Sequence, residues 1–217
     1  MAGLAAKLGS LGYHVNLPVL PGHASVPEDL LKVSHEDWLK TVEQAFIETR
    51  AATKKQIAIG LSMGATLALH LAANFSFAGV VALAPALKLP WWQEAGIHVL
   101  APIIKTRRKP HGPDVNDDYG KQVLNSYPEY PLAAALEVFH LQRRVRAELD
   151  RITMPLLVIH SRHDHTIPLH NVGYLLARVR STHAEKMIVE KSFHVLTVDY
   201  DREAIFARIA HFIQQVT

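Results

Sequence analysis

Cysteine is absent from the 217 residues, which excludes disulfide bonds, thiolate metal sites and a cysteine nucleophile. No apolar run reaches the roughly 18 residues that a membrane-spanning helix needs. The first residues, MAGLAAKLGSLGYHV, lack the basic start of a signal peptide and are only weakly apolar. We therefore expect a cytoplasmic protein without a membrane span.

A strong excess of one charge is also missing, because the net charge is +3 with the fourteen histidines counted as neutral. The dense basic run Lys105-Thr106-Arg107-Arg108-Lys109 is typical of a solvated loop, and a patch for an anionic partner is the alternative. Nucleic-acid-binding proteins usually concentrate such residues in a stripe, so we expect no nucleic-acid partner. With 49% hydrophobic residues, the chain suits one domain over residues 1–217.

Apolar runs that alternate with helical periodicity predict βαβ units and an α/β fold with a mostly parallel sheet flanked by helices. Ser34 followed by Asp37 resembles a capping box at the start of a helix. Residues 87–150 interrupt the alternation and predict a lid insertion over the carboxyl edge of the sheet. The expected strands cover residues 13–20, 56–61, 77–86, 154–164 and 185–194, and the expected helices cover residues 1–11, 35–53, 63–74, 171–180 and 202–215.

A serine lies between a buried apolar run and a helical pattern in the stretch IAIGLSMGATLALHL. Gly60, Ser62 and Gly64 fit the pattern G-x-S-x-G, and this strand-to-helix position is what a nucleophile elbow requires. The glycines would leave room for close backbone packing, and the N–H of Met63 would donate to an oxyanion. The alternative is a serine that only caps the helix, a role that needs neither glycine.

A serine nucleophile needs a base, and the base needs an orienting acid. The order serine, acid, histidine along the chain is typical of this elbow. Asp164 ends a strand at the carboxyl edge of the sheet, and His194 follows the next strand. We therefore expect Asp164 and His194 to be the catalytic partners of Ser62.

Other acidic residues fit this arrangement less well. Asp150 precedes its strand and would lie at the opposite edge of the sheet. Asp199 and Asp201 follow the predicted catalytic histidine, and we expect them to cap the last helix.

The remaining histidines have simpler interpretations. His160 lies within a strand, where a satisfied histidine is usual, and His70 and His140 lie mid-helix as packing or surface residues. His163 and His165 flank the predicted acid and could suggest a metal. No third ligand follows at matching spacing, so we expect no metal site.

The chain resembles the carboxylesterase and monoacylglycerol-lipase branch of the α/β-hydrolases. The resemblance implies hydrolysis of carboxylic esters without a cofactor, and a small lid over residues 87–150 that shapes an apolar acyl pocket. The matching stretches are LPVLPGHASVPEDL with HEDWL, IAIGLSMGATLALHLA, PLLVIHSRHDHTIP and KSFHVLTVDYDRE.

One family feature is expected to be missing. The family has a strand with a His-Gly-aromatic motif before the first helix, and that loop supplies the second oxyanion N–H. No such motif precedes residues 1–15, and Pro21-Gly22-His23 is a different family feature. The first strand and the oxyanion loop of the family would then be absent. Residues 13–20 would pair directly with residues 56–61, or two copies would exchange a segment as a homodimer, which we favour.

We therefore predict a serine esterase that cleaves small-molecule esters of short or medium acyl chains. Trp91, Trp92 and Ile97 in the insertion suggest an apolar acyl site, and ordinary lid packing is the alternative. Peptidase, thioesterase and acyltransferase chemistry remain open because the same triad serves them. A truncated or degenerate hydrolase-like protein that binds or assembles with little turnover is the competing hypothesis.

Overall fold

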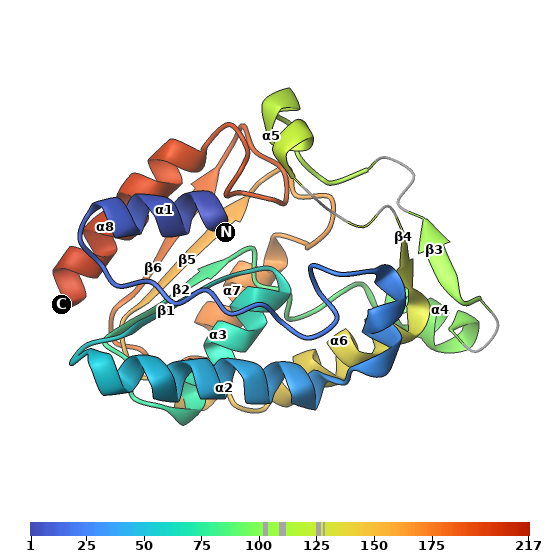
Figure 1. The fold of residues 1–217 in the computed structure, drawn as a ribbon, viewed down its shortest axis with the longest axis horizontal. Coiled ribbons are helices and arrows are strands. Elements are labelled where there is room, and N and C mark those ends of the chain that lie inside the picture. The colour runs from blue at the N-terminus through green and yellow to red at the C-terminus, as the bar shows by residue number, and fades with distance from the viewer. Residues whose placement is uncertain (102–103, 109–111, 125–126, 128) are drawn as a thin grey trace.

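A parallel sheet forms the centre of the protein (Figure 1). The computed structural model describes residues 1–101, 104–108, 112–124, 127 and 129–217. The strand order is β1-β2-β5-β6, and β2 and β5 are buried along their whole length. Continuous burial is expected of strands covered on both faces, so the predicted α/β sheet is confirmed. The strands are β1 (Ile57–Leu61), β2 (Gly79–Leu83), β5 (Leu156–Ser161) and β6 (Ala184–Val189).

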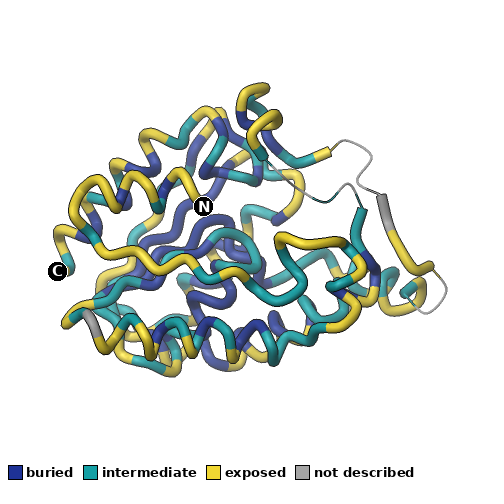
Figure 2. The backbone as a smooth tube through the Cα atoms, in the orientation of Figure 1, coloured by how far each residue is buried: buried dark blue, intermediate teal, exposed yellow. Residues whose placement is uncertain are grey.

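Helices cover both faces of the sheet and enclose two apolar clusters. Figure 2 shows the buried strands at the centre and exposed stretches along the surrounding helices. One face carries α1 (Ala2–Ser10) and α8 (Arg202–Val216). Within the described residues, no helix is both long and apolar enough to cross a bilayer. The cytoplasmic location stays a prediction. The other face carries α2 (His35–Ala52), α3 (Met63–Asn74), α6 (Leu132–Arg146) and α7 (His170–Leu176).

The start of α2 confirms the predicted capping box. The N–H and hydroxyl of Ser34 donate to Oδ2 of Asp37 over 2.9 and 2.8 Å. One turn further, Trp38 is 1% exposed and its indole N–H donates to the carbonyl of Pro21. The cap and the buried indole together fix where the helix begins and which face it buries.

The predicted insertion contains two short antiparallel strands and several helices. Its elements are α4 (Trp91–Leu100), β3 (Thr106–Arg108), α5 (Asp118–Val123), β4 (Glu129–Pro131) and the helix α6 named above, and β3 pairs with β4. The 3₁₀ helices η1 (Pro27–Lys32) and η2 (Leu149–Arg151) contact β4 and α3 respectively. The domain boundaries and the lid role of residues 87–150 stay predictions, and Lys109 of the basic run lies outside the described residues.

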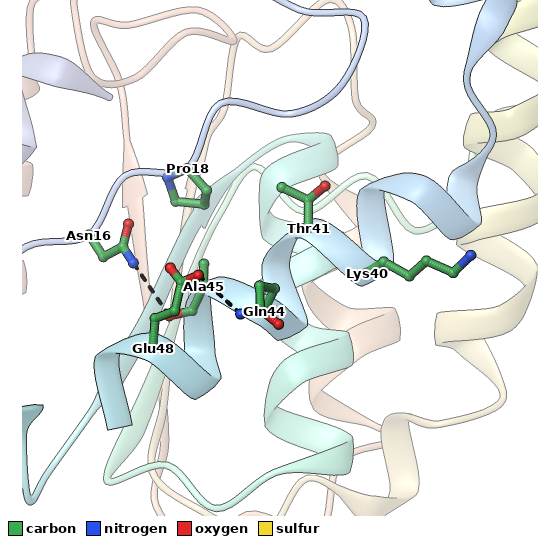
Figure 3. A pocket seen from close by; sticks show the side chains of 7 residues that line it. All are labelled: Asn16, Pro18, Lys40, Thr41, Gln44, Ala45 and Glu48. Carbon is green, nitrogen blue, oxygen red and sulfur yellow. Dashed lines mark hydrogen bonds between the residues drawn. The ribbon is translucent and has the colours of Figure 1, made fainter. Parts of the chain in front are cut away.

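Residues 13–20 do not form the predicted strand. They run as an extended segment beside α2, and the side chain of Asn16 donates to the carbonyl of Ala45 and to Oγ1 of Thr49. Figure 3 shows this segment beside a shallow hollow of about 450 Å³ that α2 and Pro18 line. An extended segment becomes a strand only when a neighbour pairs with its backbone, and no strand bridge involves residues 13–20.

The expected partner is β1, and among the described residues no strand pairs with its outer edge. Gln56 accepts from the N–H of Ala78, and the N–H of Ser62 donates to Leu83, so even-numbered residues face β2. Strand alternation turns residues 57, 59 and 61 the other way. In the part of the chain that the structure describes, no backbone hydrogen bond joins them to residues 13–20. A cavity of about 610 Å³ lies there instead, so the expected direct pairing is wrong.

Candidate active site

Ser62 occupies a strained turn between β1 and α3. Its φ of 57° and ψ of −120° are a conformation that side-chain-bearing residues rarely adopt. A Cβ at Gly60 would lie 2.0 Å from the carbonyl oxygen of Gly64, so only glycine fits there. A Cβ at Gly64 would meet no described atom within 4 Å. The expectation that glycine is needed for close backbone packing therefore holds at Gly60 and is wrong at Gly64, where the Cβ direction is open.

The strand ends bring Ser62, His194 and Asp164 into one hydrogen-bonded chain. Nε2 of His194 lies 2.9 Å from Oγ of Ser62, and Nδ1 lies 2.7 Å from Oδ2 of Asp164. The side chains of His194 and Asp164 are 10% and 1% exposed, so water screens their pairing little. This is the geometry of a nucleophile, a base and an orienting acid.

Asp164 is held in its ionised form by the loop that follows β5. Burial opposes ionisation, but the hydrogen bond from His194 and the backbone N–H of Ile167 outweigh it and hold the pKa of the carboxyl below its usual value. Oδ1 accepts the N–H groups of Thr166 and Ile167 over 2.8 and 2.7 Å. An ionised Asp164 favours the tautomer with hydrogen on Nδ1 of His194, which leaves Nε2 free to accept the serine proton.

His160 lies beside this chain without joining it. The ring is fully buried, Nδ1 donates to the carbonyl of Ser161 over 2.8 Å, and Nε2 is 3.8 Å from Oδ2 of Asp164. Burial lowers the pKa of this imidazole and keeps it neutral. His160 therefore packs behind the acid as a neutral ring.

The carboxylates of Asp199 and Asp201 hold the histidine loop. Asp199 accepts the N–H of Phe193 over 2.8 Å, and Asp201 accepts the N–H of Ser192 over 2.8 Å. Asp201 stands at the N-cap of α8, but its side chain makes no cap hydrogen bond. The expectation that both residues cap the last helix was wrong, because their carboxylates point toward the loop before His194.

Asp114, which no sequence pattern marks, links the loops that carry Asp164 and His194. Its carboxylate accepts the N–H of His165 over 3.0 Å and the hydroxyl of Thr166 over 3.0 Å. Its main-chain carbonyl accepts the N–H groups of His194 and Val195, each over 3.1 Å. Asp114 lies in a segment without regular secondary structure and belongs to no spacing motif, so only the fold reveals its role.

The other predicted site residues lie at the edges of this arrangement. Met63 is the first residue of α3, next to Ser62. Trp91 and Trp92 are 79% and 60% exposed on α4, and Ile97 is half-buried on the same helix. The helix α4 packs against α6. No described contact joins these three side chains to the serine, so their role in substrate binding stays a prediction.

Comparison with known proteins places this geometry in a family. The family model described as "Serine aminopeptidase, S33" matches residues 1–201. A thermostable monoacylglycerol lipase of Bacillus sp. (strain H-257) is 30% identical, over 98% of this chain and 84% of that protein. A carboxylesterase of Bacillus subtilis (strain 168) is 23% identical, over 98% of this chain and 86% of that protein. The chain therefore belongs to this family of α/β-hydrolases.

Solved structures agree with that assignment. A structure described as "LipS and LipT, two metagenome-derived lipolytic enzymes" aligns with a TM-score of 0.94 and 28% identity, over 99% of this chain and 87% of that one. The Est1E structure with bound ferulic acid from Butyrivibrio proteoclasticus aligns with a TM-score of 0.67 and 17% identity, over 99% and 82% of the two chains. The second likeness is one of fold alone.

Proposed function

We propose that this chain hydrolyses carboxylic esters, with Ser62 as the nucleophile, His194 as the general base and Asp164 as the orienting acid. The observation that carries the proposal is the hydrogen-bonded chain of 2.9 and 2.7 Å that begins at a serine in a strained elbow. The similarity to a monoacylglycerol lipase and a carboxylesterase, over 98% of the chain in each case, supports esters as the substrate class.

The reaction follows from the protonation states at the site. Oγ of Ser62 attacks the ester carbonyl carbon while Nε2 of His194 takes the serine proton. The imidazolium, stabilised by the Asp164 carboxylate, gives that proton to the departing alcohol as the C–O bond breaks. Water, deprotonated by His194, then attacks the acyl-enzyme and releases the carboxylic acid. The proton returns to Ser62, so the cycle needs no cofactor.

The N–H of Met63 is the oxyanion donor that we propose. It belongs to the first turn of α3, whose free N–H groups and dipole favour a developing negative charge. Removing one donor of this kind costs about 10² to 10³ in rate. Proline at position 63 would remove this N–H but would also restrain the backbone beside the strained elbow, so a transition-state-like adduct is the cleaner way to see the donor.

An active-site-directed organophosphonate ester tests the nucleophile. We expect one adduct per chain by intact-mass spectrometry, and peptide mapping should place it on Ser62. The matched control is Ser62→Ala, which should stay unlabelled while its thermal unfolding remains cooperative. A folded wild-type chain without an adduct would contradict the assignment of the nucleophile.

The acyl side of the substrate is proposed to lie against α4. Trp91 and Trp92 present large apolar side chains, and Ile97 lies on the same helix. A series of p-nitrophenyl esters from acetate to decanoate should show its highest kcat/KM at a short or medium chain length. The family description names an aminopeptidase, so aminoacyl-p-nitroanilides form the second panel. Turnover of the anilides alone would overturn the ester assignment.

A second function rests on the free edge of β1. Residues 57, 59 and 61 turn their backbone groups toward an apolar cavity of about 610 Å³, and unpaired strand edges attract other strands. We propose that a second copy of this chain covers this edge, as a homodimer formed by strand pairing or exchange. The chain would then serve as a binding or assembly module if its turnover is low.

Light scattering across a range of protein concentrations tests this association. We expect a species of twice the chain mass that dissociates on dilution. Replacing Ile59 by Pro removes an outward N–H from the edge and should weaken the dimer. A single species of monomer mass at every concentration, with a cooperative melt, would rule the homodimer out.

A further inference from the structure

Two histidines and a glutamate converge on the surface where α2 begins beside α6. Nδ1 of His35 lies 2.6 Å from Oε2 of Glu137, and Nδ1 of His140 lies 3.4 Å from Oε1 of the same carboxylate. One ligand atom from each of the three side chains lies within 4.8 Å of the others. Glu137 and His140 are three residues apart on α6, so both face the same side of that helix.

From this convergence we propose that His35, Glu137 and His140 bind a divalent transition metal, with Zn²⁺ as the preferred ion. Two imidazoles and one carboxylate are a common three-ligand set for zinc, with water completing a tetrahedron. The imidazoles also suit Ni²⁺ and Cu²⁺, while Mg²⁺ and Ca²⁺ prefer oxygen ligands. The site lies apart from the Ser62 chain and would not replace any part of the ester chemistry.

The carboxylate at the centre of this cluster is prepared to ligate. The backbone N–H of His35 donates to Oε2 over 2.9 Å, which orients the carboxylate from outside the ligand set. Such an oriented carboxylate resembles the supporting contacts found around bound metals.

The exposure of His140 gives the ion access to the three side chains. The side chain of His140 is 46% exposed, so it can rotate, and its ring lies 5.5 Å from the ring of His35 at 63°. Zinc ligands lie about 2.0 to 2.2 Å from the ion, which places tetrahedral ligand atoms roughly 3.4 Å from one another. The His35–Glu137 contact of 2.6 Å must therefore open slightly to admit the ion, while the exposed ring of His140 turns to complete the set. The alternative is a plain hydrogen bond between His35 and Glu137 that takes no metal.

A bound ion would join α2 and α6, two helices that lie far apart in the sequence. His35 is the first residue of α2, and α6 follows directly on β4 at the end of the predicted insertion. The helix α6 also packs against α4, which carries the proposed acyl-binding side chains. The metal would therefore fix α6, and with it one end of the proposed lid, to the start of α2.

Isothermal titration of the chelator-treated full chain with ZnCl₂ tests the site. We expect one tight Zn²⁺ per chain, and His140→Ala should weaken its Kd at least about tenfold, because a ligand is lost while the His35–Glu137 contact remains. The matched control is His211→Ala, an exposed histidine on α8, which should leave Zn²⁺ binding unchanged.

Thermal unfolding gives a second readout that is independent of activity. Zn²⁺ should raise the Tm of the wild-type chain and of His211→Ala, and should leave His140→Ala unmoved, because only a folded site binds the ion. MgCl₂ at the same concentration should have no effect. Equal Zn²⁺ affinity in the wild-type chain and His140→Ala would overturn the proposal. So would the absence of saturable binding up to about 100 μM ZnCl₂, which is about 100 times a Kd of about 1 μM.

Discussion

The backbone N–H of His194 donates to the main-chain carbonyl of Asp114 over 3.1 Å, so a residue of the insertion fixes the loop of the proposed base. The carboxylate of Asp114 holds His165 and Thr166, which lie beside Asp164. We therefore expect Asp114→Ala to loosen the alignment of acid and base.

A misplacement of about 1 Å can cost up to about 10² in rate, so Asp114→Ala should lower kcat by up to that factor with little change in KM. Asp114→Asn keeps an acceptor oxygen and should restore much of the activity. Ester kinetics alongside a thermal melt is the measurement. If both variants lose the same activity and have a lower Tm, Asp114 contributes to the stability of the fold and not to the alignment of the site.

The two glycines of the elbow should respond differently to alanine. At Gly60 the new methyl group would meet backbone of Gly64 at 2.0 and 2.2 Å, so the turn must move. Gly60→Ala should cost about 1 to 3 kcal/mol of unfolding free energy and abolish phosphonate labelling. Gly64→Ala meets open space at the start of α3 and should gain up to about 1 kcal/mol. Similar stability in the two variants would contradict the packing argument.

A buried ion pair between His70 of α3 and two glutamates should make stability depend on pH. His70 is 1% exposed and lies 2.7 Å from Glu148 and 3.0 Å from Glu43. Burial works against the charged imidazole, but the hydrogen bonds to Glu148 and Glu43 outweigh it and raise the pKa of His70. For Glu148, burial also opposes ionisation, and the contact with His70 outweighs it and lowers the pKa of the carboxyl.

The directions of these two pKa shifts define the pH range in which the pair stabilises the fold. The contribution of His70 is full below its unfolded pKa of 6.5 and is lost as the pH rises through the folded value. The contribution of Glu148 is present above 4.5 and is lost as the pH falls through its folded value. Glu148→Gln should therefore cost about 2 kcal/mol near pH 5.5 and less near pH 9.

Urea unfolding at both pH values measures this difference. The matched control is His183→Ala, which removes an exposed partner of Glu185 and should change stability little at either pH. A loss in Glu148→Gln that is the same at pH 5.5 and pH 9 would show that the charge on His70 does not contribute.

The exposed tryptophans of α4 should contribute to the binding of medium acyl chains and contribute little to that of the shortest ones. Burying about 50 Å² of acyl surface against an indole is worth about 1.3 kcal/mol, which corresponds to roughly tenfold in kcat/KM. We expect Trp92→Ala to lose about that factor on p-nitrophenyl decanoate and little on the acetate. Ile47→Ala, an exposed apolar residue on α2, is the control. A loss of equal size on both esters would place Trp92 outside the acyl site.

Local chemistry explains which elements the sequence predicts well. The bounds of α3 match the predicted residues 63–74, and the cap at Ser34 forms as expected, because both depend on neighbours within a few residues. Strand ends at one edge of a parallel sheet also make a meeting of Ser62, Asp164 and His194 predictable.

Interactions between distant segments explain the rest. Residues 13–20 have an apolar extended pattern, but a strand needs a partner, and the pattern does not contain one. Asp114 contacts residues more than 50 positions away, and His35 meets Glu137 across 102 positions. Such contacts depend on how residues 87–150 pack against the rest of the chain, which no local periodicity records.

The dihedral angles of Ser62 have a consequence for how this chain can change over time. A left-handed φ of 57° suits glycine far better than any residue with a Cβ, and costs about 1 to 3 kcal/mol. Ser62→Gly should therefore give a protein that outlasts its parent on heating and does nothing to esters, while Ser62→Ala keeps the strain and loses only the chemistry. Selection for stability alone would therefore favour glycine at position 62, whereas selection for ester hydrolysis would keep serine there.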